Sequence, residues 1–334
     1  MLRILHDTSY DFIKYWKHAA IATIVFIAIG LGVLAIRGLN YSIEFTSGTL
    51  IQVAFKTPPG ADAVRGAVDQ AGYKDAEITQ FGDPLNYTVK ARAVAGPNQA
   101  AANADSTAAH IQRSLESVMP SNKVSIVRTE SVGPKVGSEL RSKAIIAVLL
   151  SFVVTLIYLA IRFEWRFGVA AIIASAHDIL TTLAFMSMLH LEISLTVVAA
   201  ILTVIGYSLN DTIIIFDRVR ENLKKQRKES LRDVMNRSIN ETLPRSVLTH
   251  VTTLAATLCL LFFAGEVIRP FSWIMAFGIF TGTFSSIYVA GAILLWIERK
   301  WPRASNTANK GAARAAVEGR RTAAAAAATK AAVR

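Results

Sequence analysis

The sequence LTVVAAILTVIGYSLNDTIIIFDRVRE, residues 195–221, indicates the class of protein to which this chain belongs. It begins with an apolar run over residues 195–216, which a few polar side chains interrupt near its far end, and then turns into alternating charges. At roughly 1.5 Å of rise per residue, this run can cross a hydrocarbon core of about 30 Å. The stretch therefore predicts a membrane-spanning helix that holds one carboxylate, Asp211, within or just beneath the lipid.

A carboxylate at that depth costs about 2.5 to 3.5 kcal/mol, so such groups usually face a bundle interior or a watery cavity and mark ion or proton paths. Tyr207 and Ser208 precede Asp211 by four and three residues and share its helical face. Asn210 adds another polar group to the run. The pattern predicts a proton pathway that includes Tyr207, Asn210 and Asp211.

The whole chain is apolar, since hydrophobic residues make up 52% of its 334 residues. This is too apolar for an ordinary soluble protein. The excess lies in six blocks with few or no charges, each long enough to span a membrane. We expect the first block to stay as a span, because the stretch before it is longer than the basic region of a cleaved signal peptide. The blocks are residues 19–36, 144–161, 167–189, 195–216, 246–265 and 271–297.

The net charge of +12 is concentrated between these blocks. Residues 218–245 carry nine Lys and Arg against four acids, and the chain after residue 297 carries nine against two, whereas residues 40–130 carry eight against nine. Short flanking loops rich in Lys and Arg stay on the cytoplasmic side of a membrane. Both termini are therefore predicted to be cytoplasmic, with basic side chains near lipid headgroups. A nucleic-acid partner is not expected.

Residues 38–141 are predicted to form a small domain outside the membrane. Alternating apolar residues predict strands, and helical patterns lie between them. The order β-α-β-β-α-β is typical of two helices on one antiparallel sheet. His110 is alone and the acids are dispersed, so we expect an interaction surface rather than an active site. The predicted strands are 49–55, 76–81, 87–93 and 123–130, and the predicted helices are 61–71 and 105–118.

Glycine and proline mark two further features. Gly133, Pro134 and Gly137 precede the second span. They form either a turn that redirects the chain into the membrane or a hinge on which the external domain swings. In the last span, Gly278 and Gly282 begin a four-residue repeat of small residues that allows close helix packing.

Two more polar positions have alternative interpretations. His177 and Asp178 lie midway along the third span. They are either a buried polar pair that hydrogen-bonds to neighbouring helices or a second stage of a proton relay. A zinc site held by His177, Asp178 and His250 is the weakest alternative. Arg245, at the inner end of the fifth span, is a snorkelling anchor or the counter-charge of Asp211. Pro244 before it is expected in the first turn of that helix.

The sequence shows no sign of a disulfide, a cofactor or a catalytic site, and it divides into four parts. The single cysteine, Cys259, excludes an internal disulfide. No cofactor motif occurs, and no nucleophile and base stand at helical spacing, so an enzyme is not expected. The parts are residues 1–37 with the first span, the external domain 38–141, the five-span bundle 142–300 with a cytoplasmic loop 217–245, and a basic, Ala-rich tail 301–334 that is expected to be disordered.

Several phrases together resemble the SecD/SecF family, accessory membrane proteins of bacterial Sec protein export, and in particular its SecF members. They are VGPKVGSEL at 132–140, GYSLNDTI at 206–213, FDRVREN at 216–222 and NETLPR at 240–245. The likeness extends from about residue 10 to residue 296. After the first span the family commonly shows an aspartate and paired glycines, where this chain has EFTSG at 44–48.

The resemblance implies a six-helix half of an RND-type transporter bundle in the bacterial inner membrane. It also implies a SecD partner, a place beside the SecYEG channel, and use of the proton-motive force to help draw preproteins across the membrane. By motif position, Asp211 matches the family's membrane carboxylate and Arg245 matches its arginine in the following helix. No cofactor is implied.

Two other functions stay open. An RND-like proton-coupled exporter of small molecules or lipids would share the intramembrane acid, but it predicts a longer external domain with an apolar pocket. A non-transporting structural subunit would use Asp211 and Arg245 as a packing pair.

For the transporter, burial disfavours the charged form of a carboxyl group. Protonation of Asp211 is then expected to change helix packing and to move the external domain through the Gly133–Pro134 hinge.

Overall fold

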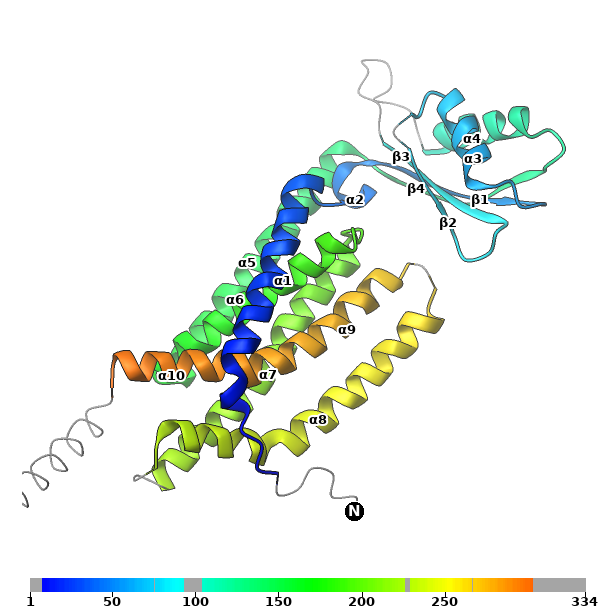
Figure 1. Cartoon of the computed structure of the whole chain (residues 1–334). Helices are drawn as coiled ribbons and strands as arrows, with labels where there is room; N and C mark the ends of the chain where they lie inside the picture. The colour runs from blue at the N-terminus through cyan, green and yellow to red at the C-terminus, as the bar shows by residue number, and fades with distance from the viewer. Residues whose placement is uncertain (1–7, 75, 93–103, 226–228, 266, 303–334) are drawn as a thin grey trace, which may run out of the picture.

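A computed structural model of the chain describes residues 8–74, 76–92, 104–225, 229–265 and 267–302. It consists of a helical bundle with a small α+β domain attached at one end (Figure 1). We call the end of the bundle beside this domain the near end and the opposite end the far end.

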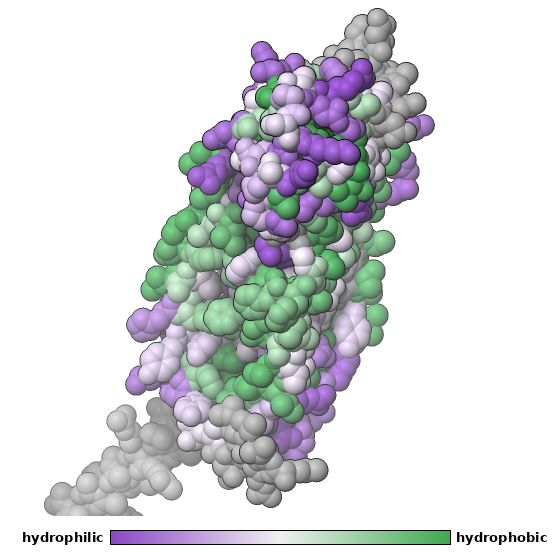
Figure 2. Space-filling view, turned by 90° about the vertical axis from the view of Figure 1, so that its right-hand side faces the viewer, coloured by the Kyte–Doolittle hydropathy of each residue, from purple (hydrophilic) through white to green (hydrophobic). Residues whose placement is uncertain are grey.

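Six helical segments in the described ranges are long and apolar enough to span a membrane, as the sequence predicted. Figure 2 shows a broad apolar zone over the bundle, with hydrophilic residues beyond it at both ends. The chain is therefore a multi-pass membrane protein. The first span joins η1 (Phe12–Tyr15) to α1 (Trp16–Arg37), the next four are α5 (Pro134–Arg162), α6 (Trp165–Met188), α7 (Leu195–Lys225) and α8 (Leu231–Phe263), and the last joins α9 (Arg269–Phe284), the π-helical η2 (Ser285–Ala290) and α10 (Gly291–Lys300).

The spans differ in how deeply they lie in the bundle. Only 11% of the apolar window of the first span and 6% of that of α5 are buried, against 50% for α6, 44% for α7 and 56% for the last span. Because lipid tails are as apolar as leucine, exposed helices can keep Ile, Leu and Val on their surface. The first span and α5 are thus peripheral, and α6, α7 and the last span form the centre.

Two helices continue beyond their apolar runs. α7 extends past Phe216 to Lys225, and α8 begins at Leu231, so much of the predicted loop 217–245 is helical. Pro244 lies inside α8 and not in a first turn, which corrects the expectation from sequence, because the helix starts well before it. A proline inside a helix removes one backbone hydrogen bond and bends the axis, and Figure 1 shows α8 changing direction along its length.

The α+β domain confirms the predicted order β-α-β-β-α-β. Its four strands form one antiparallel sheet in the order β2-β3-β1-β4, with two helices on one face (Figure 1). Alternation along β1 directs Ile51 and Val53 into a core with Ile111 and Leu115, which fixes the strand register. The elements are β1 (Gly48–Phe55), α3 (Ala61–Gln70), β2 (Glu77–Gln80), β3 (Asn86–Arg92), α4 (Ala104–Val118) and β4 (Val124–Val132).

A short helix, α2 (Ile43–Thr46), connects α1 to β1. The Ser42 hydroxyl caps it by accepting a hydrogen bond from the Glu44 backbone N–H at 3.3 Å. The chain leaves α2 through Ser47, whose φ of 63° and ψ of 151° fall in a region that side chains disfavour and glycine tolerates.

We expect Ser47→Gly to stabilise the protein by about 1 kcal/mol, because glycine adopts this backbone conformation without steric strain. The midpoint of thermal unfolding of the purified protein in nanodiscs should rise. Thr46→Gly is the matched control, since Thr46 belongs to α2 and its hydroxyl donates to the Ser42 carbonyl at 3.1 Å. That variant should lower the midpoint, and a lowered midpoint in Ser47→Gly as well would contradict the assignment of strain.

Candidate functional site

α7 and α9 pack closely through matching four-residue repeats. A Cβ atom at Gly278 would lie 2.3 Å from Cγ2 of Val204, and one at Gly282 would lie 3.0 Å from Cβ of Ser208. Larger residues would therefore separate the two helices at both positions. The small-residue repeat noted in the sequence brings the last span against the polar face of α7.

Asp211 lies inside the bundle with 3% of its surface exposed. Ser246 of α8 donates a hydrogen bond to its Oδ1, and Ser286 of η2 also interacts with the carboxyl group. In the described part of the chain, Oδ2 has no hydrogen-bond partner. The carboxyl group thus sits where α7, α8 and η2 meet, with one oxygen held and the other able to accept a proton without losing a contact.

Tyr207 and His250 lie beside this carboxyl group. Their rings are edge to face with centroids 5.2 Å apart, and the Tyr207 hydroxyl donates to the Thr249 carbonyl at 3.2 Å. Both side chains interact electrostatically with Asp211. His250 is buried, and its Nδ1 has no hydrogen-bond partner among the described residues. A carboxyl, a phenol and an imidazole therefore lie side by side within the bundle.

Asp178 on α6 is a second buried carboxylate, with 1% of its surface exposed. Ser208 of α7 donates a hydrogen bond to its Oδ2, and His177 Nδ1 lies 3.0 Å from its Oδ1. The pair is thus hydrogen-bonded to a neighbouring helix. Because Ser208 precedes Asp211 by three residues on α7, the same contact places the second carboxylate one helical turn from the first.

Asn210 and Arg245 do not face Asp211. Both side chains are exposed, and Arg245 is not among the groups that act on the Asp211 carboxyl. Adjacent residues of a helix point about 100° apart. Since Asp211 and Ser246 point into the bundle, the residues just before them point away. The predicted pairing of Arg245 with Asp211 is therefore not present in the structure, where the Ser246 hydroxyl contacts the carboxyl group instead.

Three hydroxyl groups of the site are not indicated by the sequence. Ser246 stands next to the charged Arg245, and Ser286 continues the four-residue repeat of small residues in the last span. The hydroxyl of Thr212 lies 2.9 Å from that of Ser286. His250 was considered only as a metal ligand, but no group of three or more His, Cys, Asp and Glu side chains in the described ranges could hold a metal ion.

The Gly/Pro segment at the near end has a packing role at one of its residues. A Cβ atom at Gly137 would lie 3.2 Å from the Ser47 backbone nitrogen, so this glycine lets α5 approach α2. Gly133 is the single residue between β4 and α5, with Pro134 as the first residue of the helix. Its φ of −71° and ψ of 156° are ordinary extended values.

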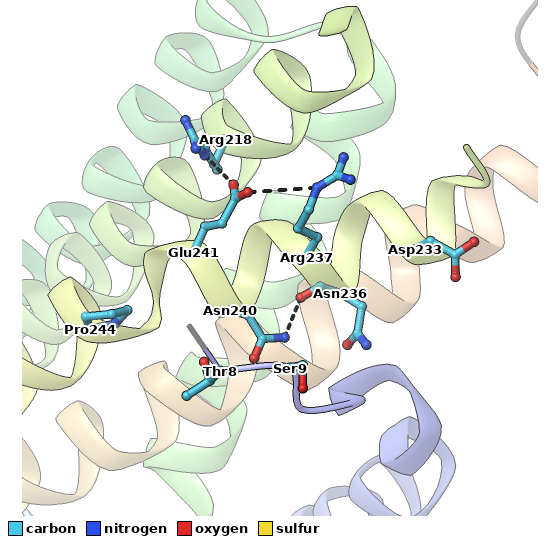
Figure 3. Close-up of a pocket in the computed structure, with 9 residues that line it drawn as sticks. All are labelled: Thr8, Ser9, Arg218, Asp233, Asn236, Arg237, Asn240, Glu241 and Pro244. Atoms are coloured by element: carbon cyan, nitrogen blue, oxygen red, sulfur yellow. Dashed lines mark hydrogen bonds and ion pairs between the residues drawn. The ribbon is translucent and has the colours of Figure 1, made fainter. Parts of the chain in front are cut away.

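At the far end, two of the sequence phrases meet. Glu241 of α8 accepts hydrogen bonds from Arg218 Nε at 2.5 Å and from Asn222 Nδ2 at 2.7 Å, both on α7. Arg237 Nε lies 3.8 Å from its other oxygen, as Figure 3 shows. FDRVREN and NETLPR thus form one polar contact that joins the extensions of α7 and α8.

A polar cavity of about 550 Å³ opens beside this contact, between α8 and the segment that precedes the first span (Figure 3). Asn240 holds that segment by its backbone, since its side chain accepts from the Tyr10 N–H and donates to the Tyr10 carbonyl, both at 2.9 Å. The lining residues are Thr8, Ser9, Arg218, Asp233, Asn236, Arg237, Asn240, Glu241 and Pro244.

Comparison with known proteins gives consistent matches over most of the chain. The family described as "Protein export membrane protein SecD/SecF, C-terminal" matches residues 110–300, and the "SecD/SecF GG Motif" matches residues 32–59. A relative named protein translocase subunit SecF, from Gemmatimonas aurantiaca, is 57% identical over 317 residues, which cover 94% of this chain and 95% of the relative.

Two matches come from Thermus thermophilus. Its protein translocase subunit SecDF is 38% identical over 303 residues, which cover 89% of this chain and 40% of the relative. The crystal structure of SecDF, described as a translocon-associated membrane protein, has a TM-score of 0.76 and 36% identity, covering 90% of this chain and 40% of that one. The chain thus spans about two fifths of the SecDF proteins and nearly all of the SecF relative.

Proposed function

We propose that this chain, which belongs to the SecD/SecF family of protein export membrane proteins and has an accessory role in Sec-dependent protein export, promotes that export through proton exchange at Asp211. The observation that carries the proposal is the environment of Asp211, a buried carboxyl group with one oxygen held by Ser246 and the other without a partner among the described residues. Uptake or release of a proton there changes the charge at the contact of three helices, which can favour a different packing.

The alternative of a purely structural subunit loses its main support. It required Asp211 and Arg245 to form a packing pair, whereas Arg245 is exposed and Ser246 contacts the carboxyl group. Asp178 and His177 are proposed as a second stage of the proton path, because Ser208 connects Asp178 to the helix that carries Asp211.

A SecD partner follows from the fused SecDF relatives, in which 40% of the length corresponds to this chain. We propose that this partner covers the exposed face of α7. Thr203, Gly206 and Asn210 recur along that face and are exposed, whereas the peripheral helices expose residues such as Ile24 at 64% and Leu149 at 60%. A polar amide facing lipid is costly, so a second set of helices is the better neighbour.

The remaining assignments follow from family membership and charge. The near end is proposed to face the periplasm and the far end the cytoplasm of the bacterial inner membrane, because Lys and Arg gather at the far end. The α+β domain would then lie beside the exit of the SecYEG channel and contact the emerging preprotein.

The proposal is tested by expressing a tagged chain in cells that lack it. We expect a SecD-like protein and components of the channel to copurify from the membrane fraction, and preprotein export to accelerate. The acceleration should disappear when a protonophore collapses the proton gradient. Export at the same rate with and without the chain, or an acceleration that survives the protonophore, would contradict the proposal. The first of these results would favour a small-molecule exporter.

A further inference from the structure

The near end of α7 is joined to the chain segment that leads into the α+β domain. The backbone N–H of Leu195, the first residue of α7, donates a hydrogen bond to Glu44 Oε2 at 2.6 Å. Beside this contact, Ile193 N–H donates to the Asn40 carbonyl at 2.7 Å and Ser42 N–H donates to the Ile193 carbonyl at 2.9 Å. The loop before α7 and the segment before β1 therefore run together as a short parallel pair.

A side-chain contact ties the sheet itself to the same loop. Lys90 of β3 forms an ion pair with Glu192, and their side chains are 14% and 26% exposed. Partly buried ion pairs are screened less by salt than exposed ones. The start of α7 and the loop before it are thus bonded to the domain at two places. Glu44 of α2, just before β1, binds Leu195, and Lys90 of β3 binds Glu192.

Packing adds to these polar contacts. Phe45 of α2 is buried in a cluster with Val197 and Ala200 of α7. Only Ser47 separates α2 from β1. The carboxylate of Glu44 also lies at the N-terminus of a helix of 31 residues, where negative charge is favoured by the helix dipole and by unpaired N–H groups. Since β1 is a central strand of the sheet, a displacement of α7 reaches the middle of the domain through α2.

We propose that Glu44 is a positioning residue that couples α7, and hence Asp211, to the α+β domain. This inference rests on the proposed function, because it assumes that α7 moves when Asp211 changes its protonation state. It differs from the hinge predicted at Gly133 and Pro134, which lies on the other connection of the domain. The connection between β4 and α5 allows the α+β domain to move relative to the bundle, and the contact between Glu44 and Leu195 makes the domain follow α7.

Hydrogen exchange on the assembled complex in nanodiscs tests the coupling. Asp211→Asn serves as a permanently neutral side chain, and its effect is measured in the wild-type, Glu44→Ala and Glu44→Gln backgrounds. Two sets of backbone amides are followed, those of β1 and those at the far end of α7, residues 218–225. Glu139→Gln is the matched control, because Glu139 lies at the same end of the bundle and pairs at 2.7 Å with Lys143 on its own helix.

We expect Asp211→Asn to change the exchange rates of β1 amides by about fivefold or more in the wild type and in Glu139→Gln, as typical coupling energies imply. In Glu44→Ala the change at β1 should disappear while the change in α7 persists. Glu44→Gln, which keeps an acceptor oxygen without the charge, should give a smaller change than the wild type and keeps the test usable if Glu44→Ala does not fold.

A change at β1 that survives both substitutions of Glu44 would overturn the inference and leave the proposed function standing. A change in α7 without any change at β1 in the wild type would also overturn it. If Asp211→Asn altered neither set of amides and left export unchanged, the proposed function would fail, and the inference with it.

Discussion

Asp211→Asn is expected to remove the part of preprotein export that depends on the proton gradient, and to reduce it to the level of cells that lack the chain. The amide side chain has nearly the same shape and can still accept the hydrogen bond from Ser246, so the variant should fold and assemble with its partner. It cannot gain or lose a proton. The loss is measured as the difference between export rates with and without a protonophore.

Asp217→Asn is the matched control for this experiment. Asp217 lies six residues further along α7, has 38% of its side chain exposed, and pairs with Arg162 at 2.6 Å. An exposed ion pair contributes about 0 to 1 kcal/mol, so the variant should keep the export that depends on the gradient. If Asp211→Asn exported at the wild-type rate under the same gradient, proton exchange at this carboxyl group would be excluded as the driving step.

Gly30→Ala is expected to produce the largest loss of stability from a single methyl group. Gly30 lies on α1 against α6, and a Cβ atom there would be 2.2 Å from Cβ and 2.5 Å from Cα of Ala184. The backbone of Ala184 cannot rotate away as a flexible side chain could. The two helices must separate, and we expect a destabilisation of at least about 2 kcal/mol, seen as a lower midpoint of thermal unfolding in nanodiscs.

Gly32→Ala provides the control on the same helix, two residues away. A Cβ atom at Gly32 meets no other atom within 4 Å, so the variant should unfold at the wild-type temperature or slightly above it, since alanine favours helix more than glycine does. Equal midpoints for the two variants would show that α1 does not pack against α6 as described.

Much of the fold could be predicted because its signals are periodic and local. Six apolar runs fixed the spans, and alternation in the segment after residue 48 predicted the strands to within one or two residues. Burial of Asp211 was predictable from the energy of a charge in lipid. These inferences need the spacing of residues along the chain, and they do not require knowledge of which elements meet.

The partners of the site residues were not predictable in the same way. Whether Arg245 or Ser246 faces Asp211 depends on a rotation of about 100° of α8 about its axis, which the apolar pattern near Pro244 does not fix. The contact between Glu44 and Leu195 joins residues that are 151 positions apart. No local pattern indicates it, because α2 supplies a single turn and α7 begins after a short loop.

We propose that Asp211 takes up and releases a proton within the assembled complex. Difference infrared spectroscopy of the complex in nanodiscs, with Asp211→Asn as the reference, measures the protonated carboxyl group of this residue directly. We expect its carbonyl band to appear as the pH of the sample is lowered and to disappear as the pH is raised. A band that is absent at every pH, or that is present and never responds to pH, would exclude proton exchange at Asp211.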